Sequence, residues 1–324
     1  MTESRYSPPF WLRNPHVQTL WPKLFRKLPA LPLQRERVEL TDGDFIDLSW
    51  SLAGTGPPVL VLHGLEGTLR SHYALPMMAA LDRAGFQAVF MHLRGCSGEA
   101  NRLPRTYHSG ASEDLAEVLA HLRASGSPVV AAVGFSLGGN LLLKYLGETG
   151  ASSLLRAAVA ISVPFVLGDA ARRLEEGMSR IYQQYLLNRL RQSYQLKFKT
   201  IPSPLRVSLE QIHTLREYDH LVTAPLNGFA GADDYYRRCS SRGYLSGITT
   251  PTLILHAKDD PFMYPHDIPT PAEVGPGVRL AIHAHGGHVG FISGRFPWQT
   301  QYLTDQLVPD FLKEQGLVQE LPAS

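Results

Sequence analysis

Short apolar runs and helical periodicities alternate along most of the chain. The strand-like runs cover residues 58–62, 87–91, 129–133, 157–162, 252–256 and 278–284. Amphipathic helical patterns cover residues 72–84, 112–124 and 138–146, and a last one covers about 297–313. Strands that alternate with helices in this way predict an α/β fold with a mostly parallel central sheet and helices on both faces.

The alternation is interrupted between about residues 164 and 249. Residues 172–199 form an amphipathic, arginine-rich helical pattern, residues 208–222 form a second one, and no convincing strand occurs. We therefore predict a helical cap at about 164–249, inserted into a domain that spans 36–324. The arginines fit a solvated helix face or, as the alternative, a contact with an anionic surface.

The chain begins with a segment of different character. Residues 1–35 are rich in proline and aromatic residues, and we expect an N-terminal arm that packs on the main domain. Because tryptophan and phenylalanine accompany lysine and arginine there, a flap that faces lipid or substrate is the alternative. Residues 38–40 and 45–50 then flank the turn sequence of residues 41–44, which predicts a β-hairpin.

Composition narrows the class of protein. The 324 residues carry a net charge of +2 with 19% charged residues, which indicates neither a nucleic-acid-binding nor a disordered protein. Two cysteines, Cys96 and Cys239, form no disulfide framework or metal knuckle. Neither a secretory signal nor an apolar run as long as a membrane span is evident, so a cytoplasmic location is expected, with peripheral membrane contact left open.

The strongest chemical signal is the sequence Gly134-Phe-Ser136-Leu-Gly138. An apolar strand precedes it and a helical pattern follows it, which is the context of a nucleophile elbow. Glycines two residues to either side of a serine let neighbouring backbones pass at a sharp turn, and the helix N-terminus favours a developing oxyanion. We predict that Ser136 is a nucleophile; a purely structural turn is the alternative.

A serine nucleophile needs a base and an orienting carboxylate, and in this type of site they follow in the order acid, then histidine. Strand 252–256 leads into Asp259-Asp260-Pro, and we favour Asp260 because it directly precedes proline. The glycine-rich loop after the last strand carries His288, our predicted base, and His285, its rival.

Two backbone N–H groups should complete an oxyanion hole, and the candidates are those of Leu65 and Leu137. The nearby His63 is interpreted as a turn residue that holds its loop by hydrogen bonds. A metal site built from His283, His285 and His288, with Asp259 or Asp260 as a further ligand, is another hypothesis. It leaves the Gly-x-Ser-x-Gly sequence unexplained. We expect no metal and no cofactor, and a structural role for Cys96.

Taken together, these motifs resemble the YheT-like esterases, a bacterial branch of the α/β-hydrolase superfamily. That branch is similar to the eukaryotic abhydrolase-domain lipases and to the yeast ethanol acyltransferase/esterases. The matching segments are residues 14–20, 63–67, 94–98, 101–110, 134–140, 259–262 and 285–291. The resemblance implies an α/β-hydrolase fold, a triad of Ser136, Asp260 and His288, and hydrolysis of carboxylic esters.

The expected function is therefore that of a serine carboxylesterase acting on a small-molecule ester of short or medium acyl chain, without a nucleic-acid partner. Transfer of the acyl group to an alcohol is the nearest alternative, since it would use the same acyl-enzyme. A non-catalytic binding protein with this fold is the alternative from another class. The oligomeric state is left undetermined.

Overall fold

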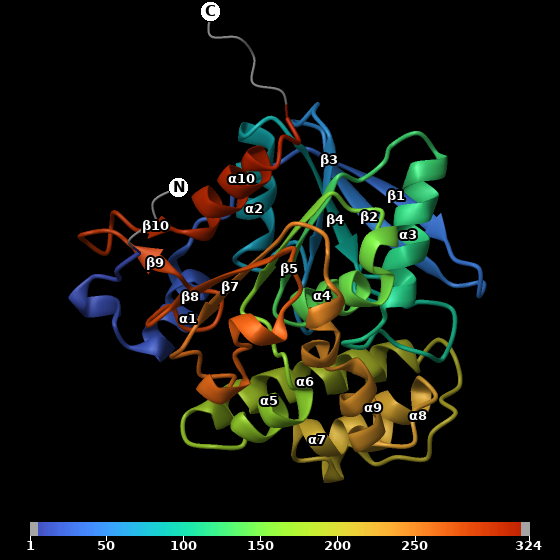
Figure 1. Cartoon of the computed structure of the whole chain (residues 1–324). Helices are drawn as coiled ribbons and strands as arrows, with labels where there is room; N and C mark the ends of the chain where they lie inside the picture. Colours follow the sequence, from blue (N-terminus) through green and yellow to red (C-terminus); the bar gives the residue numbers. More distant parts are fainter. Residues whose placement is uncertain (1–5, 319–324) are drawn as a thin grey trace, which may run out of the picture.

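An eight-stranded sheet runs through the computed structural model of the protein, which describes residues 6–318 (Figure 1). The strand order is β1-β2-β4-β3-β5-β6-β7-β8, and within this sheet only β2 runs antiparallel to its neighbours. The predicted α/β class and mostly parallel sheet are confirmed. The strands are β1 (Leu33–Glu39), β2 (Phe45–Ser51), β3 (Pro58–Leu62), β4 (Gln87–His92), β5 (Ala131–Phe135), β6 (Ala157–Ile161), β7 (Thr252–Ala257) and β8 (Val278–His283).

Helices cover both faces of the sheet, as its central strands require. Along β3, Leu60 and Leu62 belong to one buried cluster, whereas Val59 and Val61 belong to another. Side chains on a strand alternate between faces, so both faces of β3 are buried and its sequence is continuously apolar. The first cluster contains α3 (Ser112–Ala124) and α4 (Leu137–Thr149), and the second contains α2 (Ala74–Arg83) and α10 (Thr304–Glu314).

The helical segment between β6 and β7 is built from several short helices. They are α5 (Leu167–Arg173), α6 (Ser179–Lys197), α7 (Leu215–Tyr218), a π-helical turn (Asp219–Thr223), α8 (Ala224–Leu226) and α9 (Ala232–Cys239). Figure 1 shows them grouped beneath the sheet, and they contribute buried clusters of their own. We call residues 164–249 the cap.

Two helix boundaries within the cap differ from the predicted ones. The prediction of a single helix at 172–199 is wrong. The helical segment is interrupted between α5 and α6, around Gly177, whose φ is +50°. The second predicted helix begins only at Leu215, where Thr214 and Glu217 form a capping box. Before it lies a 3-10 turn, Leu209–Gln211.

The last helix also begins later than predicted. Residues 297–303 do not belong to α10, because β10 (Gln301–Tyr302) pairs with β9 (Ile292–Ser293) in a small antiparallel ribbon. The turn between these strands contains Gly294, whose φ is +111°. Pairing with the nearby strand β9 thus replaces the first turns of the expected helix.

The N-terminal segment packs on this ribbon. A 3-10 turn (Phe10–Leu12) precedes α1 (Pro15–Phe25), which begins with Asn14 as N-cap and proline at its first position. The buried amide of Gln18 donates to the carbonyl of Ile292 at 3.1 Å and accepts from its N–H at 2.9 Å. Residues 1–5 of the predicted arm lie outside the described residues.

The remaining short elements are 3-10 turns, at Gly150–Ser152, Ser241–Gly247, Pro265–Asp267 and Pro271–Glu273. Within residues 6–318, no helix combines the length and the apolar character that crossing a membrane would require.

Candidate active site

Ser136 occupies a tight turn between β5 and α4. Its φ of +52° and ψ of −118° are unusual for a residue with a side chain, and its N–H donates to the carbonyl of Ile161 at 2.8 Å. A Cβ added at Gly134 would lie 2.5 Å from the carbonyl oxygen of Gly138, and one added at Gly138 would lie 2.6 Å from that of His63. The turn is therefore possible only with glycine at both positions.

His288 connects this serine to a carboxylate. Nε2 of His288 lies 3.1 Å from Oγ of Ser136, and Nδ1 lies 2.9 Å from Oδ2 of Asp260. Asp260 follows β7 and is only 4% exposed, while His288 lies in the loop after β8. The ring of Phe262 stacks on the imidazole with 4.0 Å between centroids and an interplanar angle of 4°. Packing and the carboxylate together hold the ring toward Ser136.

The neighbouring carboxylate has a different partner. Oδ2 of Asp259 lies 3.1 Å from Nδ1 of His285, and its Oδ1 accepts the N–H of Gly287 at 3.0 Å. The sequence alone allowed either aspartate to be the partner of the base, and in the structure the two contact different histidines. The one that the prediction favoured, Asp260, is the one placed beside His288.

The loop after β3 brings the predicted Leu65 N–H near the serine. A Cβ on Gly64 would lie 3.2 Å from Cβ of Ser136, so this backbone passes directly beside it. The N–H of Gly64 donates to the hydroxyl of Tyr73 at 2.9 Å, and that of Glu66 donates to the hydroxyl of Tyr107 at 2.8 Å. Within the described part of the chain, the Leu65 N–H between them finds no protein acceptor.

The second predicted donor is the N–H of Leu137, the first residue of α4. It directly follows Ser136 and, like the other N–H groups of a first helical turn, it lacks an intrahelical partner. The N-terminus of α4 also carries the positive end of the helix dipole. The residues around Ser136 therefore present N–H groups suited to a negatively charged oxygen.

Glu66 is a residue of this loop whose importance the sequence analysis missed. Its φ is +54°, its Oε1 accepts the hydroxyl of Tyr107 at 2.7 Å, and its Oε2 accepts the hydroxyl of Ser193 in α6 at 2.5 Å. Nη2 of Arg189 also donates to its carbonyl at 3.2 Å. The one available signal was its position next to Leu65. Glu66 links the loop beside Ser136 to the cap.

His63 holds the start of the same loop. Its Nδ1 donates to the carbonyl of Gly64 at 2.8 Å and its Nε2 accepts the N–H of Leu93 at 3.1 Å. Complete burial lowers the pKa of His63 to about 4, so the imidazole is neutral near pH 7. These contacts match the interpretation of His63 as a turn residue.

A cavity of about 680 Å³ opens at Ser136 and His288. Apolar cap side chains form much of its wall, among them Leu167, Leu174, Leu186, Leu190 and Tyr218. Leu20, Lys23 and Leu28 of the N-terminal segment line another part. The serine is thus reached through a largely apolar space between the cap, the sheet and α1.

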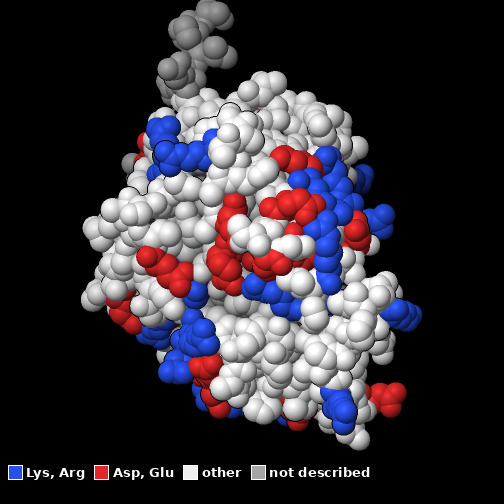
Figure 2. Space-filling view, turned by 90° about the vertical axis from the view of Figure 1, so that its right-hand side faces the viewer, with Lys and Arg blue, Asp and Glu red and all other residues white. Residues whose placement is uncertain are grey.

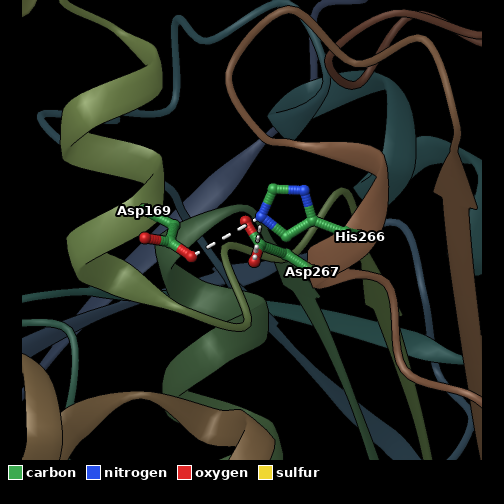
Figure 3. A group of neighbouring side chains, drawn as sticks. All are labelled: Asp169, His266 and Asp267. Carbon is green, nitrogen blue, oxygen red and sulfur yellow. Dashed lines mark ion pairs between the residues drawn. The ribbon is translucent and has the colours of Figure 1, made fainter.

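The histidines proposed as metal ligands do not converge. Among residues 6–318, the one group of three His, Cys, Asp or Glu side chains close enough to share an ion is Asp169, His266 and Asp267 (Figure 3). It joins α5 to the 3-10 turn after β7 and includes none of the C-terminal loop histidines.

At Cys96, burial raises the pKa of the thiol, which keeps it protonated.

An eight-stranded α/β sheet with a serine turn after β5, an acid after β7 and a histidine after β8 defines the α/β-hydrolase class. A family model described as the alpha/beta hydrolase fold matches residues 57–295. The chain belongs to the α/β-hydrolase family and, within it, to the YheT-like esterases, as its motifs predicted.

The relatives support both levels of this assignment. The chain is 43% identical to "Putative esterase YheT" of Escherichia coli (strain K12), over 96% of this chain and 94% of that protein. It is 33% identical to "Phospholipase ABHD3" of Mus musculus, over 97% of this chain and 79% of the relative. The solved Pyrococcus furiosus esterase PF2001 shares the fold, with a TM-score of 0.57 and 16% identity over 88% of this chain and 91% of that one. The protein is accordingly an esterase- or lipase-type hydrolase.

Proposed function

We propose that this protein is a serine carboxylesterase that hydrolyses carboxylic esters through an acyl-enzyme on Ser136. The observation that carries the proposal is the hydrogen-bonded series from Ser136 through His288 to Asp260, which ends at an apolar cavity. A serine hydroxyl is a weak nucleophile by itself, and this arrangement supplies both the base and the group that orients it.

In the first half of the reaction, Oγ of Ser136 attacks the ester carbonyl carbon while Nε2 of His288 takes the hydroxyl proton. The carbonyl oxygen becomes negatively charged and is bound by the N–H groups of Leu65 and Leu137. Asp260 stabilises the imidazolium and keeps Nδ1 protonated. The bond to the alcohol oxygen then breaks, and the alcohol leaves with the proton from Nε2.

In the second half, water replaces the alcohol. His288 takes a proton from the water as its oxygen attacks the acyl carbon, and the same N–H groups bind the oxyanion. The bond to Oγ breaks, Oγ recovers the proton, and the carboxylic acid leaves. The ester and one water supply every atom that is transferred, and His288 carries the proton in both halves.

The cavity supports an ester with an apolar acyl chain of short or medium length, because leucine and tyrosine side chains of the cap line it. The names of the relatives, a putative esterase and a phospholipase, agree with an ester substrate. In this proposal, residues 164–249 act as the cap that shapes the acyl site.

Labelling with a fluorophosphonate, beside hydrolysis of p-nitrophenyl esters of increasing acyl length, tests the proposal. Wild type should label and turn over, and Ser136→Ala should do neither while remaining folded. A folded wild type that neither labels nor turns over would instead favour the binding-protein alternative. Ester synthesis that outpaces hydrolysis in an aqueous alcohol mixture would favour acyl transfer.

A further inference from the structure

Two segments on one side of the molecule expose large apolar side chains. In the N-terminal segment, the exposed fractions are 83% for Phe10, 68% for Leu24 and 60% for Phe25. In the turn between β9 and β10, they are 77% for Trp298 and 38% for Phe296. We call these five residues the apolar rim. Single exposed apolar residues are ordinary, but a group that includes tryptophan and phenylalanine marks an interaction surface.

The two segments are firmly held together. Gln18 of α1 exchanges two hydrogen bonds with Ile292 of β9, as described above. The guanidinium of Arg26 lies 3.7 Å from the ring centroid of Tyr302 in β10 and pairs with Asp305. Figure 1 shows α1 and the β9–β10 ribbon on the same side of the molecule. The apolar rim is therefore part of one surface of the fold.

Aromatic contacts also order three of the five rim side chains, those of Phe25, Phe296 and Trp298, before anything binds. The rings of Phe296 and Trp298 stack with 5.0 Å between centroids and an interplanar angle of 2°. Phe25 packs on Trp21 at 4.3 Å. Since these side chains already have fixed partners, covering them costs little additional conformational entropy.

The charged residues within the two segments that carry the rim are all basic. Residues 6–32 contain no aspartate or glutamate, and Arg13, Lys23 and Lys27 are exposed there, as is Arg295 beside Phe296. The face that carries β1 and α3 differs, because blue and red side chains alternate across it in Figure 2. Ion pairs there include Arg37 with Glu99. Both rim segments thus contain cations and no carboxylate, and among residues 6–318 Asp305 of α10 pairs with Arg26 alone.

The rim is also continuous with the cavity. Leu20, Lys23 and Leu28, which flank the rim residues of α1 along the chain, line the cavity that reaches Ser136. Leu20 and Leu28 are themselves 38% and 39% exposed. A molecule that enters along α1 therefore passes from the apolar, cationic surface to the serine.

From these observations we propose that the protein docks on an anionic lipid surface through α1 and the β9–β10 turn, and draws its ester substrate from that surface into the cavity. Tryptophan and phenylalanine insert at the boundary between headgroups and acyl chains, while lysine and arginine are attracted to anionic headgroups. The uptake of an ester rests on the function proposed above, whereas the docking does not.

Flotation with lipid vesicles tests the docking directly. Wild type should float with phosphatidylcholine vesicles that contain roughly one-third phosphatidylglycerol, and much less with phosphatidylcholine alone. Leu24→Ser/Trp298→Ser should reduce the bound fraction at least about tenfold, because both side chains lose their insertion energy. The control Leu52→Ser/Leu221→Ser removes two exposed leucines elsewhere, 54% and 42% exposed, and should bind like wild type.

A second pair of variants tests the charge. Lys27→Gln/Arg295→Gln should weaken binding to the anionic vesicles by about tenfold or more, since each cation near such a surface contributes about a fivefold factor. The control Arg83→Gln/Arg123→Gln removes the same net charge from other exposed positions and should have little effect.

Three results would overturn docking: wild type that does not float, rim variants that float like wild type, or light scattering that shows a wild-type dimer made monomeric by Leu24→Ser/Trp298→Ser. The last would make the rim an interface between two copies of the chain. Turnover of a soluble p-nitrophenyl ester should stay within about twofold of wild type in this variant. A protein that floats but hydrolyses no ester would refute the proposed function and retain the docking.

Discussion

Oδ2 of Asp260 lies 2.9 Å from Nδ1 of His288, whereas Oδ2 of the adjacent Asp259 lies 3.1 Å from Nδ1 of His285. Two neighbouring carboxylates on one loop thus point to two imidazoles on another. Burial differs as well, because the side chain of Asp260 is 1% exposed and that of Asp259 is 17% exposed. Of the two pairs, only Asp260 and His288 are connected to Ser136 by a further hydrogen bond, through Nε2 of His288.

This geometry predicts unequal effects of two matched substitutions. Asp260→Asn should lower kcat by about 10³- to 10⁴-fold, because an amide disfavours the required tautomer and no longer stabilises the imidazolium. Asp259→Asn, the control, should stay within about tenfold of wild type. Steady-state hydrolysis of a p-nitrophenyl ester measures both. A collapse in the Asp259 variant alone would reverse the assignment.

Glu66 should act as a positioning residue for the Leu65 N–H. Glu66→Gln replaces one acceptor oxygen with a donor, so it cannot accept from both Tyr107 and Ser193. We expect kcat to fall about 10- to 100-fold with little change in KM, since an oxyanion donor acts mainly in the transition state.

A boronic acid inhibitor, which forms a tetrahedral adduct with a serine, separates positioning from a general structural role. Its affinity for Glu66→Gln should fall in parallel with kcat. Ser193→Ala is the control, because it leaves the contact to Tyr107 in place and should have a smaller effect. Equal losses in kcat and in thermal stability, with inhibitor affinity unchanged, would contradict the positioning role.

The turn around Ser136 should not tolerate a methyl group. Gly138→Ala places a Cβ 2.6 Å from the carbonyl oxygen of His63, so the backbone must shift. We expect a loss of about 3 kcal/mol in the free energy of unfolding, and loss of fluorophosphonate labelling. Gly243→Ala is the control, since a Cβ there meets no atom within 4 Å. Urea unfolding gives the comparison, and wild-type stability in Gly138→Ala would refute the argument.

Buried neutral histidines should make the fold sensitive to acid. Burial lowers the pKa to about 4 in His63 and His256 and to about 3 in His72 and His108. These values lie below the unfolded value of about 6.5, so the unfolded chain takes up protons first as the pH falls. The stability should be fully present above about pH 6.5 and should decrease toward pH 4.

By about pH 5, each of these imidazoles should cost on the order of 2 kcal/mol of stability. Asp219 and Asp267 act in the opposite direction, because burial raises the pKa of each carboxyl to about 6, but they are two groups against four. The urea midpoint, measured between about pH 7.5 and pH 5, should therefore fall steeply. A constant midpoint would show that these histidines are accessible to protons in the folded state.

The sequence by itself determined the features that depend on local pattern. Continuously apolar runs such as 58–62 predicted strands buried on both faces, because the alternation of side chains leaves no polar side to a central strand. The turn at Ser136 could be located because Gly-x-Ser-x-Gly lies between an apolar strand pattern and a helical pattern, which are all local features. The family followed from motifs spread along nearly the whole chain.

Tertiary structure decided the features that depend on distant partners. Asp259 and Asp260 differ in role only because their loop directs one side chain inward and the other outward. The sequence around the two aspartates does not indicate which of them points inward. The role of Glu66 arises from contacts with Tyr107 and Ser193, which are far from it along the chain. The β9–β10 ribbon replaced predicted helix where β9 is hydrogen-bonded to Gln18 of the distant α1. The apolar rim formed because long-range packing sets which apolar side chains stay uncovered. Local periodicity contains neither.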